Sequence, residues 1–145
     1  MDILLLNNRP LIAAMLDAAK KCSHPVEEEG GVILQANDDY LFIKVKNIYE
    51  GTNTAAGLYE TDQIALKNDV LPRLNEGWKF YASFHTHPQF SATPSSLDLA
   101  KLFEGFKYNV IYSQRTDMFS FSQWVANSCA TFYVPVTTLE VLNKQ

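Results

Sequence analysis

The chain has few cysteines, few histidines and no long apolar run. Its two cysteines, Cys22 and Cys129, show neither metal-binding spacing nor a disulfide framework, so we expect buried free thiols in a reducing compartment. No apolar stretch approaches membrane-spanning length, and the apolar residues 3–6 are too short for a secretion signal and lack preceding basic residues. These absences predict a cytoplasmic protein without a membrane partner.

Positive charge is also scarce. The 12 Lys and Arg residues face 16 Asp and Glu residues, which gives a formal net charge of -4. A nucleic-acid-binding surface would need a basic face, so this balance argues against a nucleic-acid partner. A hydrophobic content of 47% with 19% charged residues is typical of a globular protein. No linker or repeat divides the 145 residues, and we therefore predict a single domain, 1–145.

The most informative stretch covers residues 84–98, FHTHPQFSATPSSLD. The apolar run 78–84 predicts a strand that delivers two histidines. Because residues i and i+2 of a strand point to the same face, His85 and His87 should converge on one point. Pro88 cannot donate to a sheet ladder and should end the strand.

A helix start should follow this strand end. Thr93 is a suitable N-cap, and Pro94 suits the first turn. Ser95 and Asp98, three residues apart, would then share a face near the helix N-terminus. Two histidines and a carboxylate make a plausible three-ligand zinc site with an open position for water.

Each part of this stretch also has a plainer explanation. A single histidine is more often a surface or core residue than a ligand. Ser95 and Asp98, taken alone, form a capping box, in which the acidic side chain reaches back to the cap. It is the combination of these parts that is improbable by chance.

The complete string resembles the signature of the JAB/MPN (JAMM) metallopeptidases. His85-Thr86-His87-Pro88, six residues, and then Ser95-Ser96-Leu97-Asp98 match it without departure. The resemblance implies that His85, His87 and Asp98 bind Zn²⁺ and that Ser95 serves the oxyanion.

The resemblance also implies a catalytic glutamate upstream, three residues before a glycine that opens an apolar strand. Glu28, which precedes Gly31 by three residues, fits this pattern, and Glu27 is the alternative. Glu29 is too close to the strand. Without the resemblance, the three consecutive glutamates 27–29 would be predicted to form a solvent-exposed turn.

Periodicity predicts an α/β protein, with helices packed on a mixed sheet. This agrees with the cytidine-deaminase-like fold that the resemblance implies. The expected helices cover 11–22, 62–74 and 97–106. The expected strands cover 32–34, 40–45, the run ending in the two histidines, 110–113, 118–125 and 130–136. Residues 47–49 extend the sheet in this interpretation, and Pro135 should place the last strand at a sheet edge.

The activity implied by the resemblance is hydrolysis by an isopeptidase or peptidase next to the C-terminal tail of a ubiquitin-like protein. Such a tail is narrow and can be held as an added strand, with the loop 50–57 and Phe90 as walls. Between Asp98 and Val110 there is room only for a helix, so the second insertion of eukaryotic deubiquitinases is missing. This indicates a minimal member, such as those of bacterial ubiquitin-like conjugation or anti-phage defence systems.

Two other functions stay open at this point. One is a zinc peptidase for other bonds, such as phage tail or cell-wall peptides. The other is a non-catalytic scaffold of the same fold, which the retention of every signature residue argues against. A cysteine nucleophile is disfavoured because neither Cys22 nor Cys129 lies in a context that lowers a thiol pKa. The sequence also lacks the His-Glu-x-x-His motif of thermolysin-like sites and the Cys-x-x-Cys motif of zinc deaminases.

Overall fold

A computed structural model describes residues 8–21, 30–37, 39–45, 63–87, 91–94, 106–125 and 128–144. Its strands form one sheet in the order β2-β1-β3-β4-β5-β6. They are β1 (Gly30–Ala36), β2 (Asp39–Val45), β3 (Lys79–His87), β4 (Tyr108–Ser113), β5 (Met118–Val125) and β6 (Ser128–Pro135). The sheet is mixed, because β3 and β4 are parallel and the other neighbours are antiparallel.

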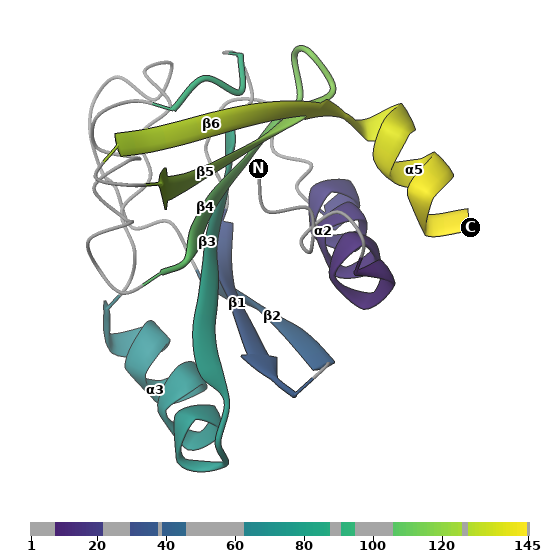
Figure 1. Cartoon of the computed structure of the whole chain (residues 1–145). Coiled ribbons are helices and arrows are strands. Elements are labelled where there is room, and N and C mark those ends of the chain that lie inside the picture. Colours follow the sequence, from purple (N-terminus) through teal and green to yellow (C-terminus); the bar gives the residue numbers. More distant parts are fainter. Residues whose placement is uncertain are drawn as a thin grey trace.

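Helices cover both faces of this sheet. The helices α2 (Arg9–Lys21) and α5 (Val136–Lys144) lie on one side, and α3 (Gln63–Asn75) lies on the other (Figure 1). The prediction of an α/β protein with helices on a mixed sheet is confirmed. None of the described helices is long and apolar enough to cross a membrane.

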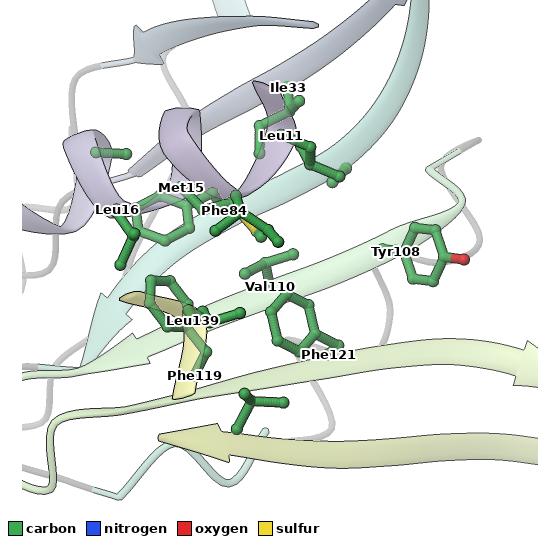
Figure 2. Close-up of a cluster of buried hydrophobic side chains, with 14 of the residues drawn as sticks. Leu11, Met15, Leu16, Ile33, Phe84, Tyr108, Val110, Phe119, Phe121 and Leu139 are labelled. Carbon is green, nitrogen blue, oxygen red and sulfur yellow. The ribbon is translucent and has the colours of Figure 1, made fainter. Parts of the chain in front are cut away.

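The main core fills the space between the sheet and the pair α2 and α5 (Figure 2). It includes Leu11, Ile12, Met15 and Leu16 of α2, Phe84 of β3, Val110 of β4, Phe119 and Phe121 of β5, and Leu139 of α5. Phe84 is 1% exposed and meets the Phe42 ring edge to face, at a centroid distance of 5.7 Å. A smaller cluster, Val32, Leu34 and Val70, lies between the sheet and α3.

Helix α2 forms where periodicity predicts it, two residues earlier than expected. Pro10 stands in the first turn, where its missing N–H costs no helical hydrogen bond. Asn8 caps the helix, because its Oδ1 accepts a hydrogen bond from the Leu11 N–H at 3.3 Å. The predicted apolar face is buried at Leu11, Met15 and Ala18. Cys22 lies outside the described residues.

The C-terminal end contains a helix that the sequence did not predict. The expected strand 130–136 is observed as β6, which ends at Pro135, and a helix follows at once. Val136 and the two threonines after it have low helix propensity, so the local sequence does not announce α5. The helix forms because its Leu139 is fully buried in the main core. The edge position expected from Pro135 is confirmed, since β6 ends the sheet.

Several other predictions fall on residues that the structure does not describe. These are the strand extension 47–49, the loop 50–57, Phe90 and most of the helix 97–106, of which the described Phe106 is not helical. Cys129 is a free, half-buried thiol, so its expected burial is only partial.

A bulge in β3 decides which face carries the histidines. Ile33 of β1 pairs with Ala82, whereas Leu34 pairs with Phe80, so Tyr81 is an extra residue on β3. Tyr81 and Ala82 both belong to the main core, and the alternation of side chains therefore shifts by one residue. Beyond the bulge, the odd-numbered residues of β3 share the face on which α3 lies.

Candidate metal centre

His85 and His87 end the central strand β3. Directly beside His85 in register lie Gly30 of β1 and Ile111 of β4, and Ser113 of β4 lies beside His87. The two histidines are 4% and 7% exposed, so both imidazoles are enclosed by the protein. A strand paired on both sides is a rigid base for such side chains.

The Nε2 atoms of the two imidazoles lie within hydrogen-bonding distance of each other. These atoms are 3.2 Å apart, and the ring centroids are 5.0 Å apart at an interplanar angle of 61°. Zinc–nitrogen bonds of about 2.05 Å at a tetrahedral angle would place two ligand nitrogens about 3.3 Å apart. The His85–His87 pair therefore fits two neighbouring positions of one tetrahedral zinc ion.

The ring of His87 is oriented by a backbone carbonyl. Its Nδ1 lies 2.8 Å from the Ser91 oxygen, and because a carbonyl only accepts, Nδ1–H donates. In the neutral imidazole this leaves the Nε2 lone pair available as a metal ligand. Metal-binding histidines usually carry such a partner on the other ring nitrogen.

The sheet face around the histidines is polar although it is buried. The hydroxyl of Ser83 donates to Asn109 Oδ1 at 2.9 Å, and Ser122 and Thr131 share a hydrogen bond of the same length. The fully buried Ser120 Oγ has no hydrogen-bond partner in the described part of the chain. The opposite face of the same strands is the apolar main core, whereas the face of the histidines combines these polar groups with the smaller apolar cluster under α3.

The segment 91–94, which follows His87, is tied to the far edge of the sheet. Ser91 and Thr93 share a hydrogen bond of 3.1 Å between their hydroxyls, and Tyr133 of β6 donates to Thr93 Oγ1 at 3.2 Å. Between them Ala92 is 2% exposed and anchors the segment. Neither Ser91 nor Tyr133 belongs to the signature, so no sequence pattern predicts their part in the site. The predicted N-cap role of Thr93 depends on residues outside the described ranges.

The chain is similar to a known family of prokaryotic proteins. Residues 8–126 match the sequence model of a family described as prokaryotic homologs of the JAB domain. The chain belongs to this family.

Two solved structures are similar to this one, and the first of them shares its fold. A Desulfitobacterium hafniense protein with a solution structure has a TM-score of 0.60 at 18% identity, with 83% of this chain and 84% of that chain covered. A crystal structure of a JAB1/MPN domain protein from Archaeoglobus fulgidus has a TM-score of 0.46 at 21% identity, covering 86% of this chain and 84% of that chain. No curated protein matches the sequence.

The other residues expected to complete a JAB-type centre, Glu28, Ser95 and Asp98, lie outside the described residues. The structure therefore brings together His85 and His87 of the predicted set, and within the described ranges no group of three or more metal-ligating side chains occurs. The flanking chain is described on both sides. Gly30, two residues after Glu28, pairs with His85, and Pro94 directly precedes Ser95.

A groove of about 600 Å³ lies between the edge strand β2 and helix α3. It is lined by Leu41, Phe42, Ile43, Asn68, Asp69, Pro72, Arg73 and Glu76. Its lining contains no histidine or cysteine, and Arg73, in the last turn of α3, forms an exposed ion pair of 3.6 Å with Glu76, which directly follows the helix. These side chains offer no alternative to the histidine pair as a metal centre.

Proposed function

We propose that this JAB-family protein is a zinc-dependent peptidase or isopeptidase that cleaves after the C-terminal tail of a ubiquitin-like protein. The observation that supports it most directly is the buried His85–His87 pair, with its Nε2 atoms 3.2 Å apart. This separation is the one that two ligand nitrogens of a single tetrahedral zinc ion would take. The Ser91 carbonyl, which keeps a proton on His87 Nδ1, supports the same conclusion.

In this proposal His85, His87 and Asp98 hold the zinc. Zinc in such a site polarises a carbonyl and lowers the pKa of water to about 7, which makes hydroxide available at neutral pH. Asp98 follows Pro94 by four residues, so an extended chain of about 14 Å limits its distance from the segment that contacts His87. A third, anionic ligand would also balance the charge that two neutral imidazoles leave uncompensated.

Glu28 is the proposed general base. It stands two residues before Gly30, the register partner of His85, and two residues span about 7 Å at most. Its carboxylate would accept a proton from the attacking water and return it to the leaving amine. Ser95 would donate its hydroxyl to the carbonyl oxygen as negative charge develops there, a contribution of about 3 kcal/mol. Glu27 remains the alternative base.

The proposed substrate is an extended tail, because a narrow peptide can reach a centre enclosed on a sheet face. A peptide that binds as an added strand forms backbone hydrogen bonds with the edge of the sheet. Recognition of a tail that ends in glycines would therefore depend little on side chains. A prokaryotic JAB domain of this size fits a bacterial system of ubiquitin-like conjugation or anti-phage defence. The proposal for the substrate rests on the family resemblance and on the expected narrowness of the centre.

The test is cleavage of fusions whose upstream part is a ubiquitin-like protein, with product masses read by mass spectrometry. We expect a single cut after the tail, its loss on chelation, and its recovery with Zn²⁺. Glu28→Gln should keep zinc and lose turnover, whereas Asp98→Ala should lose both.

Matched variants separate the alternatives. Full activity in Glu28→Gln with none in Glu27→Gln would move the base by one residue. Cleavage of unrelated peptides but of no ubiquitin-like fusion would contradict the substrate and keep the peptidase. Zinc binding without cleavage of any peptide would favour a scaffold.

A further inference from the structure

We propose that Tyr133, on the edge strand β6, is a positioning residue for the metal centre and acts on His87 through Thr93 and Ser91. The inference rests on the metal-binding role proposed above and adds residues that the family signature does not contain. Tyr133 O–H donates to Thr93 Oγ1 at 3.2 Å, and Ser91 O–H donates to the same oxygen at 3.1 Å. The Ser91 carbonyl then accepts the His87 Nδ1–H at 2.8 Å.

The register of the sheet explains how so distant a residue takes part. His85, Ile111, Ser120 and Tyr133 are successive partners across β3, β4, β5 and β6. Directly paired residues share a face, so Tyr133 stands on the same face as the histidines, about 14 Å away across three strand spacings. The segment 91–94 connects the two positions on this face.

Packing alone does not explain the orientation of Tyr133. Its side chain is 47% exposed, so the ring gains little from burial, yet its hydroxyl is directed at the Thr93 hydroxyl. Ala92, buried between Ser91 and Thr93, anchors the same short segment at its centre. The tyrosine and the buried alanine together limit how far the Ser91 carbonyl can move.

The position of that carbonyl matters for the state of His87. A neutral imidazole carries one proton, on either nitrogen, and only the form protonated at Nδ1 presents a lone pair at Nε2. The Ser91 oxygen favours this form. If the segment loosens, the ring gains freedom to rotate and to move its proton to Nε2, which then cannot bind a metal.

The test compares Tyr133→Phe and Thr93→Val with a control, Tyr112→Phe. Tyr112 also donates its hydroxyl to an exposed acceptor, Asp117 Oδ1 at 2.9 Å, but it pairs with Phe119 and belongs to the opposite face. Long-range ¹H–¹⁵N spectra of the metal-free protein report the protonation of each His87 ring nitrogen. We expect the Nδ1–H form in the wild type and the control, and a mixture of both forms in the two test variants.

Zinc affinity, measured by competition with a chelating dye, is the second measurement. Loss of one hydrogen bond should weaken zinc binding about fivefold in Tyr133→Phe and in Thr93→Val. Thr93→Ser, which keeps a hydroxyl, should restore the wild-type affinity, and Tyr112→Phe should not change it.

The proposal is overturned if Tyr133→Phe and Thr93→Val retain the wild-type His87 spectrum, or if the control changes as much as they do. A wild-type protein that binds no zinc would refute the proposed function, but the metal-free spectra would still decide whether Tyr133 positions His87. If Thr93→Ser weakens zinc binding as much as Thr93→Val does, the loss of affinity comes from the shape of residue 93 and not from its hydroxyl. That result would also overturn the proposal.

Discussion

Zinc should stabilise the folded protein, and His87→Ala should abolish that stabilisation. A ligand that binds only the folded state stabilises it by about 2.7 kcal/mol at 100 times its dissociation constant. For a chain of this size each kcal/mol raises Tm by about 3 °C, which gives a zinc-dependent rise of about 8 °C. The measurement is thermal unfolding of protein freed of metal, with and without added Zn²⁺.

The histidine change has a second effect, which is independent of zinc. His87 is 7% exposed, and its removal leaves the Ser91 carbonyl without the donor that now lies 2.8 Å away. Losing this partner should lower the stability of the metal-free protein by about 1–2 kcal/mol. The metal-free Tm should therefore fall by roughly 5 °C, and added zinc should then raise it no further.

Ser83→Ala separates these two effects. Ser83 stands two residues before His85 on the same face and donates a buried 2.9 Å hydrogen bond to Asn109. The change should destabilise the protein by a similar amount, about 1–2 kcal/mol, but the zinc-dependent rise should remain. An undiminished rise in His87→Ala would refute the assignment of His87 as a ligand. A rise lost equally in Ser83→Ala would show that the assay reports general destabilisation.

Two further changes, with one control, test the two faces of the sheet by chemical denaturation. Phe84→Ala should lower the free energy of unfolding by about 4 kcal/mol, because it opens a cavity beside Phe42 and Phe119. The control, Val141→Ala at a 57% exposed position, should change the free energy of unfolding by less than about 0.5 kcal/mol. Ser120→Ala should leave stability unchanged or raise it by up to about 1 kcal/mol, because the buried hydroxyl has no partner among the described residues. A loss of 2 kcal/mol or more in Ser120→Ala would mean that this hydroxyl is bonded in solution.

The parts of the fold that the sequence predicts are those whose signal is local. Periodicity and breakers place α2 and α3 to within two residues at each end. Gly77, with φ of 100°, ends α3, and Asn37, with φ of 54°, makes the turn between β1 and β2, as the residue types suggest. In both places the residue that ends the element is of a type that readily adopts the positive φ found there.

Helix α5 and the bulge in β3 depend on contacts between distant residues instead. Thr137 and Thr138 favour a strand, and only the burial of Leu139 in the main core makes a helix the better solution. The extra residue Tyr81 looks like any other member of an alternating strand. Its displacement follows from the pairing of Phe80 with Leu34, which no local pattern records.

The candidate site divides in the same way. His85 and His87 were predictable because their spacing is a property of one strand, and their Nε2 atoms do meet. Ser91 contributes through its backbone carbonyl, which no side-chain pattern can reveal. Tyr133 is brought to the face of the site by the order and register of four strands, and its hydrogen bond to Thr93 becomes apparent only once the sheet is known.

The bulge at Tyr81 shows how one strand serves both packing and chemistry. With strict alternation Phe80 would lie on the face of Ala82 and Phe84. The extra residue instead places Phe80 against Phe106, at a centroid distance of 5.2 Å, beside the smaller cluster of Val32, Leu34 and Val70. Tyr81 packs with Tyr108 in the main core. The first half of β3 thus buries aromatic rings on both faces. In its second half, one face packs against the main core and the other face carries the histidines. The core on the opposite side of the strand thereby gives the histidines a rigid support.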